Sequence, residues 1–112
     1  MFKFVENKSK MGLLEMLGLK AKVNYKEIYE NGAIIIDVRT KGEYSHGNFK
    51  GSINIPLDRI SGKVKEIKKK NKSIIVVCRS GMRSGQAASI LKQNGVDAYN
   101  GGPWTSLESK FS

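Results

Sequence analysis

The chain alternates short β-branched runs with segments of helical periodicity. Two runs, Ala33–Val38 and Ser73–Cys78, are almost entirely apolar, which is typical of strands buried on both faces of a parallel sheet. Val96–Tyr99 predicts a third, shorter strand. Ser52–Pro56 alternates apolar and polar residues and ends at a proline, so we expect a strand at or near the edge of the sheet.

Three helices are expected around these strands. Residues 24–31 begin with a potential N-cap asparagine, residues 83–94 carry small and apolar residues on one side, and a glycine follows each segment. A third helix has its buried stripe at Ile60, Val64 and Ile67, with lysines around the rest of its surface. With right-handed crossovers, this pattern predicts a three-layer α/β/α domain with a mostly parallel sheet of four or five strands.

Residues 1–22 form an N-terminal extension, and residues 23–112 form the predicted domain. Within the extension, Met11–Leu19 is apolar and predicts a short helix packed on the domain. Glu15 interrupts this stretch and no small-residue cleavage site follows it, so it is not typical of a signal peptide and we expect a cytoplasmic protein. Lysines flank the stretch, which leaves a helix on a membrane surface or against a partner as the alternative.

The basic charge of the chain is concentrated in one segment. The formal net charge is +10, and residues 59–83 contain nine basic residues and one acid, Glu66. This segment has no aromatic residue on which a base could stack. We therefore favour a solvated, lysine-rich helix face beside an anion site over nucleic-acid binding.

The cysteine and histidine content excludes several classes of site. One cysteine and one histidine cannot form an internal disulfide or a cysteine-rich zinc site, and we expect no metal and no cofactor. His46 has no acidic partner at a useful spacing and is predicted to be an ordinary surface histidine.

The segment from Cys78 to Ser84, with the sequence CRSGMRS, joins the second buried strand to the following helix. Open parallel sheets bind ligands at the carboxyl ends of their strands, and a tight loop at a helix N-terminus points backbone N–H groups at an anion. Gly81 permits a sharp turn and Ser84 is a potential cap. Arg79 and Arg83 add positive charge. We therefore expect an anion-binding loop with Cys78 at its base.

A cysteine in such a loop should ionise more readily than a free thiol. A pKa lowered by about 2 units, worth about 2.7 kcal/mol, would turn a mostly protonated thiol into a mostly ionised one at neutral pH. The alternative is an inert buried cysteine, the common fate of a lone cysteine. The glycine, two arginines and two serines that follow Cys78 favour the reactive interpretation.

A second polar segment, residues 36–44, follows the first buried strand. Arg39 and Glu43 are four residues apart and are expected to pair if a helical turn starts here. We expect Asp37 and Arg39 to organise loops rather than to take part in chemistry.

Taken together, these motifs resemble those of the single-domain rhodaneses, a family of sulfurtransferases. The matching segments are Asp37-Val38-Arg39 with Glu43-Tyr44, then Gly47, Gly51 and Asn54-Ile55-Pro56-Leu57, then the Cys78–Ser84 loop, and last Gly101-Gly102 with Trp104. The resemblance covers about residues 23–107. It implies a five-stranded parallel α/β/α fold and sulfur transfer through a cysteine persulfide.

The same resemblance implies roles for individual residues. Cys78 would carry the sulfur, the substrate would bind at Arg79, Ser80, Gly81, Met82 and Arg83, and Asp37, Arg39 and Ser84 would support the site. An anionic donor such as thiosulfate would supply the sulfur, and cyanide or an external thiol, for example a thioredoxin-like protein, would accept it. An external acceptor is implied because the chain has no second cysteine to resolve the persulfide.

The chain departs from the family pattern in three places. The usual Gly-His-Ile is Gly47-Asn48-Phe49, which leaves the chemistry intact because exchange between a thiolate and sulfur needs no histidine base. The glycine-pair segment is shortened to residues 101–104, a change that would alter the pocket wall and with it the acceptor. Residues 1–22 have no counterpart in the minimal domain.

Two other functions are alternatives to sulfur transfer. Related phosphatases share this fold but place five residues between the cysteine and the arginine, whereas Cys78 and Arg83 have four residues between them, which favours a smaller reacting centre. The second alternative is a module of the same fold that carries persulfide sulfur for a partner protein, or serves only in protein interaction, without turning over free thiosulfate.

Overall fold

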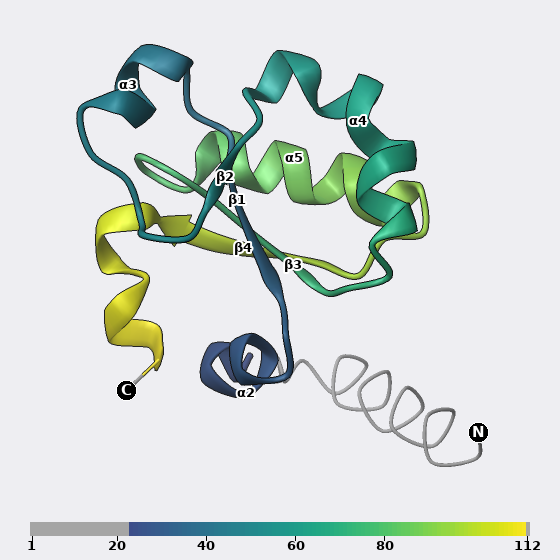
Figure 1. Cartoon of the computed structure of the whole chain (residues 1–112), viewed down its shortest axis with the longest axis horizontal. Helices are drawn as coiled ribbons and strands as arrows, with labels where there is room; N and C mark the ends of the chain where they lie inside the picture. The colour runs from purple at the N-terminus through teal and green to yellow at the C-terminus, as the bar shows by residue number, and fades with distance from the viewer. Residues whose placement is uncertain (1–22, 112) are drawn as a thin grey trace, which may run out of the picture.

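A four-stranded parallel sheet lies at the centre of residues 23–111, the part of the chain that the computed structural model describes (Figure 1). Its strands are β1 (Ile34–Asp37), β2 (Ile53–Asn54), β3 (Ile74–Cys78) and β4 (Ala98–Pro103), in the order β2-β1-β3-β4. Every neighbouring pair is parallel, which confirms the predicted α/β architecture. The four hydrophobic segments each supply one strand, so the sheet has four strands in this range where the resemblance implies five. The predicted helix of residues 1–22 lies outside the described residues.

The described residues form four α-helices, of which α2, α4 and α5 are the three expected from the sequence and α3 is a short additional one. They are α2 (Tyr25–Glu30), α3 (Lys41–Ser45), α4 (Leu57–Lys69) and α5 (Met82–Gln93), with two C-terminal 3-10 turns, η1 (Trp104–Ser106) and η2 (Glu108–Phe111). α2 begins after Asn24, whose side chain accepts a hydrogen bond from the N–H of Glu27 at 3.1 Å. No helix in the described range is long and apolar enough to cross a membrane.

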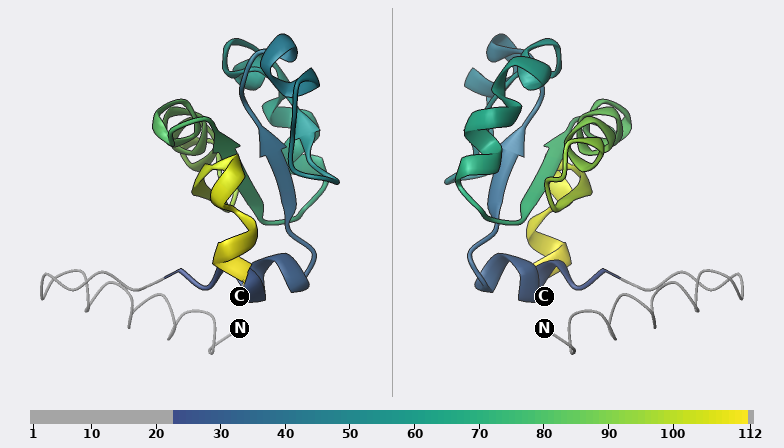
Figure 2. Two further views of the ribbon diagram at one scale, coloured as in Figure 1. Left: turned by 90° about the vertical axis from the view of Figure 1, so that its left-hand side faces the viewer. Right: turned by 90° about the vertical axis from the view of Figure 1, so that its right-hand side faces the viewer.

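Helices cover both faces of the sheet and give the domain three layers (Figure 2). α4 and α5 pack on one face around Ile36, Ile60 and Leu91. α2, η1 and η2 pack on the other face around Ile35 and Leu107. All five residues of β3 are fully buried, because this strand lies between β1 and β4 and is covered on both sides. Burial of each valine or isoleucine side chain stabilises the folded domain by about 1.5–3 kcal/mol.

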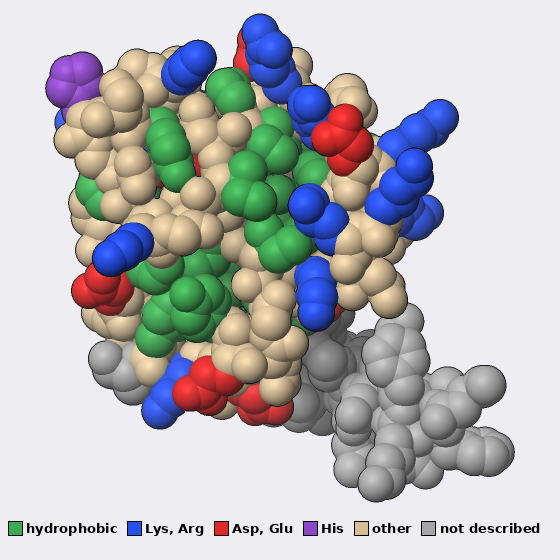
Figure 3. Space-filling model, in the orientation of Figure 1, with side chains coloured by type: hydrophobic (Ala, Val, Ile, Leu, Met, Phe, Trp, Pro, Cys, Tyr) green, Lys and Arg blue, Asp and Glu red, His purple; other side chains and the backbone are tan. Residues whose placement is uncertain are grey.

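The lysine-rich helix α4 has the two-sided character that its sequence predicts. Ile60 and Ile67 are buried beneath it, and Val64 is half-buried. Most of its lysines are exposed, among them Lys65, Lys68 and Lys69. Basic side chains accordingly gather on the side of the molecule that carries α4 (Figure 3).

Strand β4 approaches β3 so closely at Gly101 that no side chain fits there. The register between the two strands shifts so that Val76 pairs with Asn100 and Val77 pairs with Gly102, which leaves Gly101 in a β-bulge. A Cβ atom on Gly101 would lie 2.7 Å from Ile75 Cγ2 and 3.0 Å from Val77 Cγ1. The bulge thus requires glycine at this position.

We expect Gly101→Ala to destabilise the domain by about 1–3 kcal/mol, because the added atom overpacks a filled core. Gly62→Ala is the matched control, since a Cβ on Gly62 in α4 would meet no atom within 4 Å. Alanine there should stabilise the helix by up to about 1 kcal/mol. Urea unfolding measures both effects, and equal stabilities of the two variants would contradict the crowding at Gly101.

Candidate active site

The carboxyl ends of β1 and β3 lie side by side and bring together the two polar segments of the sequence. Asp37, at the end of β1, pairs in register with Val77, so Cys78 lies one residue further along the neighbouring strand. The chain continues from Asp37 into α3 and from Cys78 into α5. Parallel pairing therefore places both segments at the sheet edge where α/β proteins bind ligands.

Cys78 lies beneath its loop with no exposed surface, and its sulfur faces two hydrogen-bonding groups of that loop. The Gly81 nitrogen is 2.9 Å from Cys78 Sγ and donates to it, and the Ser84 hydroxyl oxygen is 3.3 Å away. Gly81 is the N-cap residue of α5, and its φ of +102° is in the left-handed region, which glycine adopts without strain. The turn therefore aims an N–H at the sulfur at the positive end of the α5 dipole.

Opposing effects set the pKa of the Cys78 thiol. Burial is the largest single effect and raises the pKa, because it removes the charged form from water. Hydrogen bonds from the Ser84 hydroxyl and from the N–H groups of Ser84, Gly81 and Ser80 lower the pKa, and together they outweigh burial. The net shift of the pKa is downward, as the loop sequence predicts. Its main source is the hydrogen-bonding groups of the loop rather than the charges of Arg79 and Arg83.

The Glu43 carboxylate forms an ion pair with Arg83, so the prediction that it pairs with Arg39 is wrong. The Arg83 guanidinium donates to both Glu43 carboxylate oxygens, at 2.7 and 3.0 Å. Thr40 and Glu43 also form a capping box that starts α3. The hydrogen bonds from Arg83 and Thr40 lower the pKa of Glu43 to about 2, and Glu43 raises the pKa of Arg83. The charge of Arg83 is therefore balanced within the protein.

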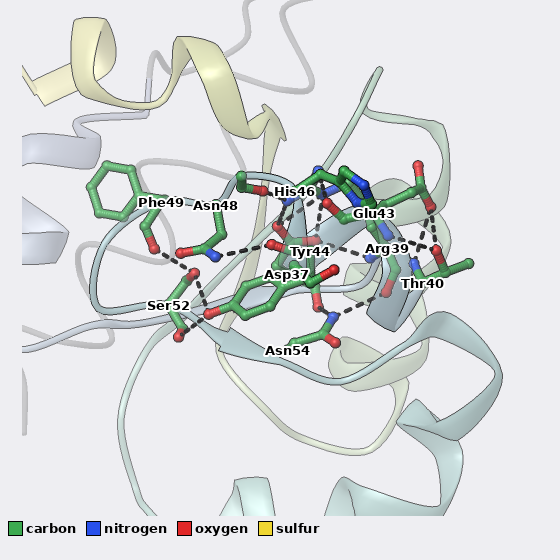
Figure 4. A network of polar contacts seen from close by, with 12 residues as sticks. Asp37, Arg39, Thr40, Glu43, Tyr44, His46, Asn48, Phe49, Ser52 and Asn54 are labelled. Carbon is green, nitrogen blue, oxygen red and sulfur yellow. Dashed lines mark hydrogen bonds and ion pairs between the residues drawn. The ribbon is translucent and has the colours of Figure 1, made fainter.

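Arg39 forms a buried ion pair with Asp37 rather than with the Glu43 carboxylate, and only its Nη1 reaches the Glu43 backbone carbonyl, at 3.4 Å (Figure 4). Its Nε and Nη2 atoms donate to the Asp37 carboxylate at distances from 2.7 to 3.0 Å. Nη2 also donates to the Gly47 carbonyl at 2.7 Å, and the guanidinium lies 4.7 Å from the centre of the Trp104 ring. Arg39 thus joins the end of β1 to the loop after α3 and to η1.

The loop between α3 and β2 is held by further polar contacts (Figure 4). Asn54 donates from Nδ2 to the carbonyls of Asp37 and Arg39, both at 3.0 Å. The Tyr44 hydroxyl donates to the Ser52 carbonyl at 2.7 Å. His46 is exposed, as predicted for a surface histidine, and its Nδ1 lies 2.8 Å from a backbone carbonyl of α3.

An open cavity of about 680 Å³ lies beside the Cys78 loop, between α3 and η1. Arg39, Glu43, Arg79 and Trp104 are among the residues that line it, whereas Cys78 does not. Arg79 is exposed and forms no ion pair with any described residue. It is therefore the loop arginine whose charge is available to an anion.

The other predicted site residues lie on the same loop. Ser80 and Met82 are exposed, Met82 by 77%, and Ser84 is fully buried against Cys78. Their roles in binding a substrate stay predictions. Between residues 23 and 111, no three side chains of histidine, cysteine, aspartate or glutamate gather closely enough to hold a metal ion.

Asn100 belongs to the site but is missing from the residues predicted by sequence. Its Oδ1 accepts a hydrogen bond from the Ser84 hydroxyl at 2.6 Å, and its Nδ2 donates to the Gly81 carbonyl at 3.0 Å. The signal available in the sequence was a polar residue after a predicted strand and directly before a glycine pair.

The family of the chain follows from comparison with known proteins. The family model of the rhodanese-like domain matches residues 21–103, which include both β-strand ends of the site and the whole Cys78 loop. This chain belongs to the rhodanese-like domain family.

Relatives of this rhodanese-like domain include named sulfurtransferases. Thiosulfate sulfurtransferase PspE of Escherichia coli is 38% identical over 61 residues, which are 54% of this chain and 59% of PspE. A tRNA sulfurtransferase of Thermoplasma acidophilum is 30% identical over 83 residues, which are 74% of this chain and 16% of that protein. A solved structure described as a rhodanese with anions from E. coli has a TM-score of 0.60 and 33% identity, over 66% of this chain and 89% of that chain. The rhodanese-like domain thus spans less than two thirds of these two curated relatives.

The ion pair between Glu43 and Arg83 should make stability depend on pH in acid. The pKa of Glu43 is lowered from 4.5 to about 2 in the folded domain. The ion pair therefore stabilises the domain fully above the pKa that Glu43 has in the unfolded chain, and this stabilisation is lost as the pH falls through the pKa of the folded state. We expect Glu43→Gln to be less stable than the parent near neutral pH, with a difference that shrinks between about pH 5 and pH 2.

Urea unfolding across this pH range measures the effect. Glu66→Gln is the matched control, because Glu66 is exposed and only 3.6 Å from an exposed Lys63, so its removal should change stability little at any pH. A Glu43→Gln difference that stays constant down to the acid limit would contradict the lowered pKa.

Proposed function

We propose that this domain is a sulfurtransferase that carries sulfane sulfur on Cys78 as a persulfide. The observation that carries the proposal is the position of the Cys78 sulfur before the N-terminus of α5, where the Gly81 N–H donates to it and the Ser84 hydroxyl oxygen lies 3.3 Å away. These groups favour the thiolate, which is the nucleophilic form of cysteine. Membership of the rhodanese-like domain family and relatives named as sulfurtransferases support the same chemistry.

Reaction with thiosulfate needs only the thiolate. The Cys78 thiolate attacks the outer sulfur of the thiosulfate dianion, and a new sulfur–sulfur bond forms while the bond inside thiosulfate breaks. Sulfite leaves with the electron pair, so that Cys78 becomes a persulfide anion without gain or loss of a proton. An acceptor thiolate then attacks the outer persulfide sulfur, and Cys78 leaves as a thiolate that the same loop donors stabilise.

The donor is proposed to be a small anion drawn to Arg79. Arg79 is exposed and unpaired within the described residues, whereas Arg83 is bound to Glu43. The names of two relatives, a thiosulfate sulfurtransferase and a rhodanese with anions, support thiosulfate or a similar donor. Cys78 has no exposed surface, so a donor reaches its sulfur only when loop residues above it move.

The acceptor is proposed to be a thiol on another molecule. The chain has one cysteine, so no second thiol of its own can resolve the persulfide. A thioredoxin-like protein or a small cytoplasmic thiol fits this requirement. A carrier that passes its sulfur to one partner protein would form the same persulfide but would turn over slowly with free acceptors.

We expect Cys78→Ser to abolish the formation of thiocyanate from thiosulfate and cyanide, because serine cannot form the persulfide. Intact-mass analysis of the parent after incubation with thiosulfate should show the gain of one sulfur atom, which cyanide removes. Circular dichroism of the variant should match the parent. Substantial residual activity in folded Cys78→Ser would rule out the persulfide mechanism, and persulfide formation without multiple turnovers would favour the carrier.

We expect the lysines of α4 to attract anionic donors through their long-range field rather than to bind nucleic acid. The field of exposed charges is screened within about 8 Å at physiological salt. Replacing Lys68, Lys69 and Lys70 by glutamine should therefore lower kcat/KM for thiosulfate modestly at low salt and hardly at all at high salt. Fluorescence anisotropy with an oligonucleotide at two salt concentrations is the counter-test, because tight binding that persists near physiological salt would overturn this expectation.

A further inference from the structure

The side chain of Asn100 is held in one orientation by the loop around Cys78. Its Nδ2 donates to the Gly81 carbonyl at 3.0 Å, and its Oδ1 accepts from the Gly102 N–H at 3.0 Å. The hydroxyl of Tyr25 in α2 also donates to the Asn100 backbone carbonyl, at 2.7 Å. These contacts assign the amide oxygen of Asn100 to the side that faces Ser84.

The Ser84 hydroxyl lies between Asn100 and Cys78 and has a single proton to donate. Its oxygen is 2.6 Å from Asn100 Oδ1 and 3.3 Å from Cys78 Sγ. Asn100 Oδ1 can only accept, so the short contact requires Ser84 to donate to Asn100. While Cys78 is a thiol, Ser84 can then accept the S–H proton, and every group is satisfied.

Ionisation of Cys78 changes this arrangement. The thiol proton leaves to solvent, and the thiolate has no proton to share with Ser84. If Ser84 still donated to Asn100, its oxygen lone pairs would face the negative sulfur. If the hydroxyl turns, it donates a charge-assisted hydrogen bond to the thiolate, while Asn100 Oδ1 keeps the Gly102 N–H.

We propose that Asn100 is a positioning residue that holds the Ser84 hydroxyl away from the neutral thiol and releases it to Cys78 Sγ when the sulfur becomes charged. The donor is thus supplied to the sulfur only in the state that needs it. Gly85 leaves room for this arrangement, because a Cβ on Gly85 would lie 3.1 Å from Asn100 Nδ2.

Other charged groups surround the sulfur but do not replace this hydroxyl. Arg83 of α5 is bound to Glu43 of α3, and Arg39 is bound to Asp37 at the end of β1. Arg79 of the loop is exposed. None of the charged side chains described in residues 23–111 forms a hydrogen bond with Cys78 Sγ, so Ser84 is the side chain that responds directly to its charge.

The consequence for catalysis rests on the proposed sulfur-transfer function. A persistently lower thiol pKa would increase the thiolate fraction but weaken its intrinsic nucleophilicity. A hydroxyl that turns toward the sulfur as negative charge develops stabilises Cys78 when it leaves its persulfide. The direction of the Ser84 hydroxyl itself does not depend on whether sulfur is transferred.

The test is a titration of the only thiol in the chain, followed by the ultraviolet absorbance of the thiolate as the pH is raised. Ser84→Ala should raise the thiol pKa, because the donor to the thiolate is lost. Asn100→Ala should lower the pKa by about half a unit, because Ser84 no longer gives up a hydrogen bond in order to turn. The double variant should match Ser84→Ala alone, since Asn100 acts through the hydroxyl.

A purely structural role for Asn100 predicts the opposite result. Loss of loop order would remove the Gly81 N–H from the sulfur, so Asn100→Ala would raise the thiol pKa and would do so equally in the Ser84→Ala background. Either observation overturns the proposal. Asn94→Ala is the matched control, because the side chain of Asn94 bonds to the Ile90 carbonyl at the far end of α5, so its removal should leave the pKa of Cys78 unchanged.

Asn100→Asp provides an independent variant of nearly the same shape. Its carboxylate holds the Ser84 hydroxyl more strongly and places a negative charge near the sulfur, so the thiol pKa should rise by at least one unit. An unchanged pKa in this variant would overturn the proposal even if Asn100→Ala fails to fold. If the titrations behave as expected but thiosulfate leaves no sulfur on Cys78, the proposed function fails and the hydroxyl assignment stands.

Discussion

The buried ion pair between Asp37 and Arg39 determines how the whole site is assembled. Taking both charges out of water costs several kcal/mol for each ion, and the pair repays this only when its remaining polar atoms are also bonded. Here Arg39 donates to Asp37 and to the Gly47 carbonyl, and it packs against Trp104. Among the described residues, no buried side-chain nitrogen or oxygen lacks a hydrogen-bond partner. An Arg39 side chain turned outward to the Glu43 carboxylate would leave the buried Asp37 carboxylate with the Arg39 backbone N–H but without a charged partner.

This choice of partner fixes the charge distribution around Cys78. Because Arg39 is committed to Asp37, Glu43 is free to bind Arg83 across forty residues of sequence. Arg83 is then balanced, and the thiolate is favoured by short-range hydrogen bonds rather than by a bare arginine charge. Arg79 and most of the α4 lysines are exposed, so their positive charge faces solvent. The exposed positive charge and the hydrogen bonds to the Cys78 sulfur therefore come from different residues.

The bulge in β4 gives the site its remaining polar group. The extra residue, Gly101, packs on the side chains of β3, and the strand on either side of it carries Asn100 and Gly102 to the loop of Cys78. A side chain at Gly101 would push this strand away from β3. The crowding that requires glycine in the core and the placement of Asn100 beside Ser84 are thus consequences of one local irregularity in the sheet.

The sequence by itself determined the strands, three of the helices and the place of the Cys78 loop between a strand and a helix. Local periodicity predicted the four strands and the helices α2, α4 and α5, because burial of one face imposes a spacing that can be read over ten residues. The Cys78 loop could also be recognised, since its glycine, serines and arginines are adjacent in sequence. Only the tertiary structure decided that Arg83 binds Glu43, that Arg39 binds Asp37, and that Asn100 reaches Ser84. These partners depend on strand register and on the burial of one carboxylate, which are properties of the assembled sheet and have no local signature in the chain.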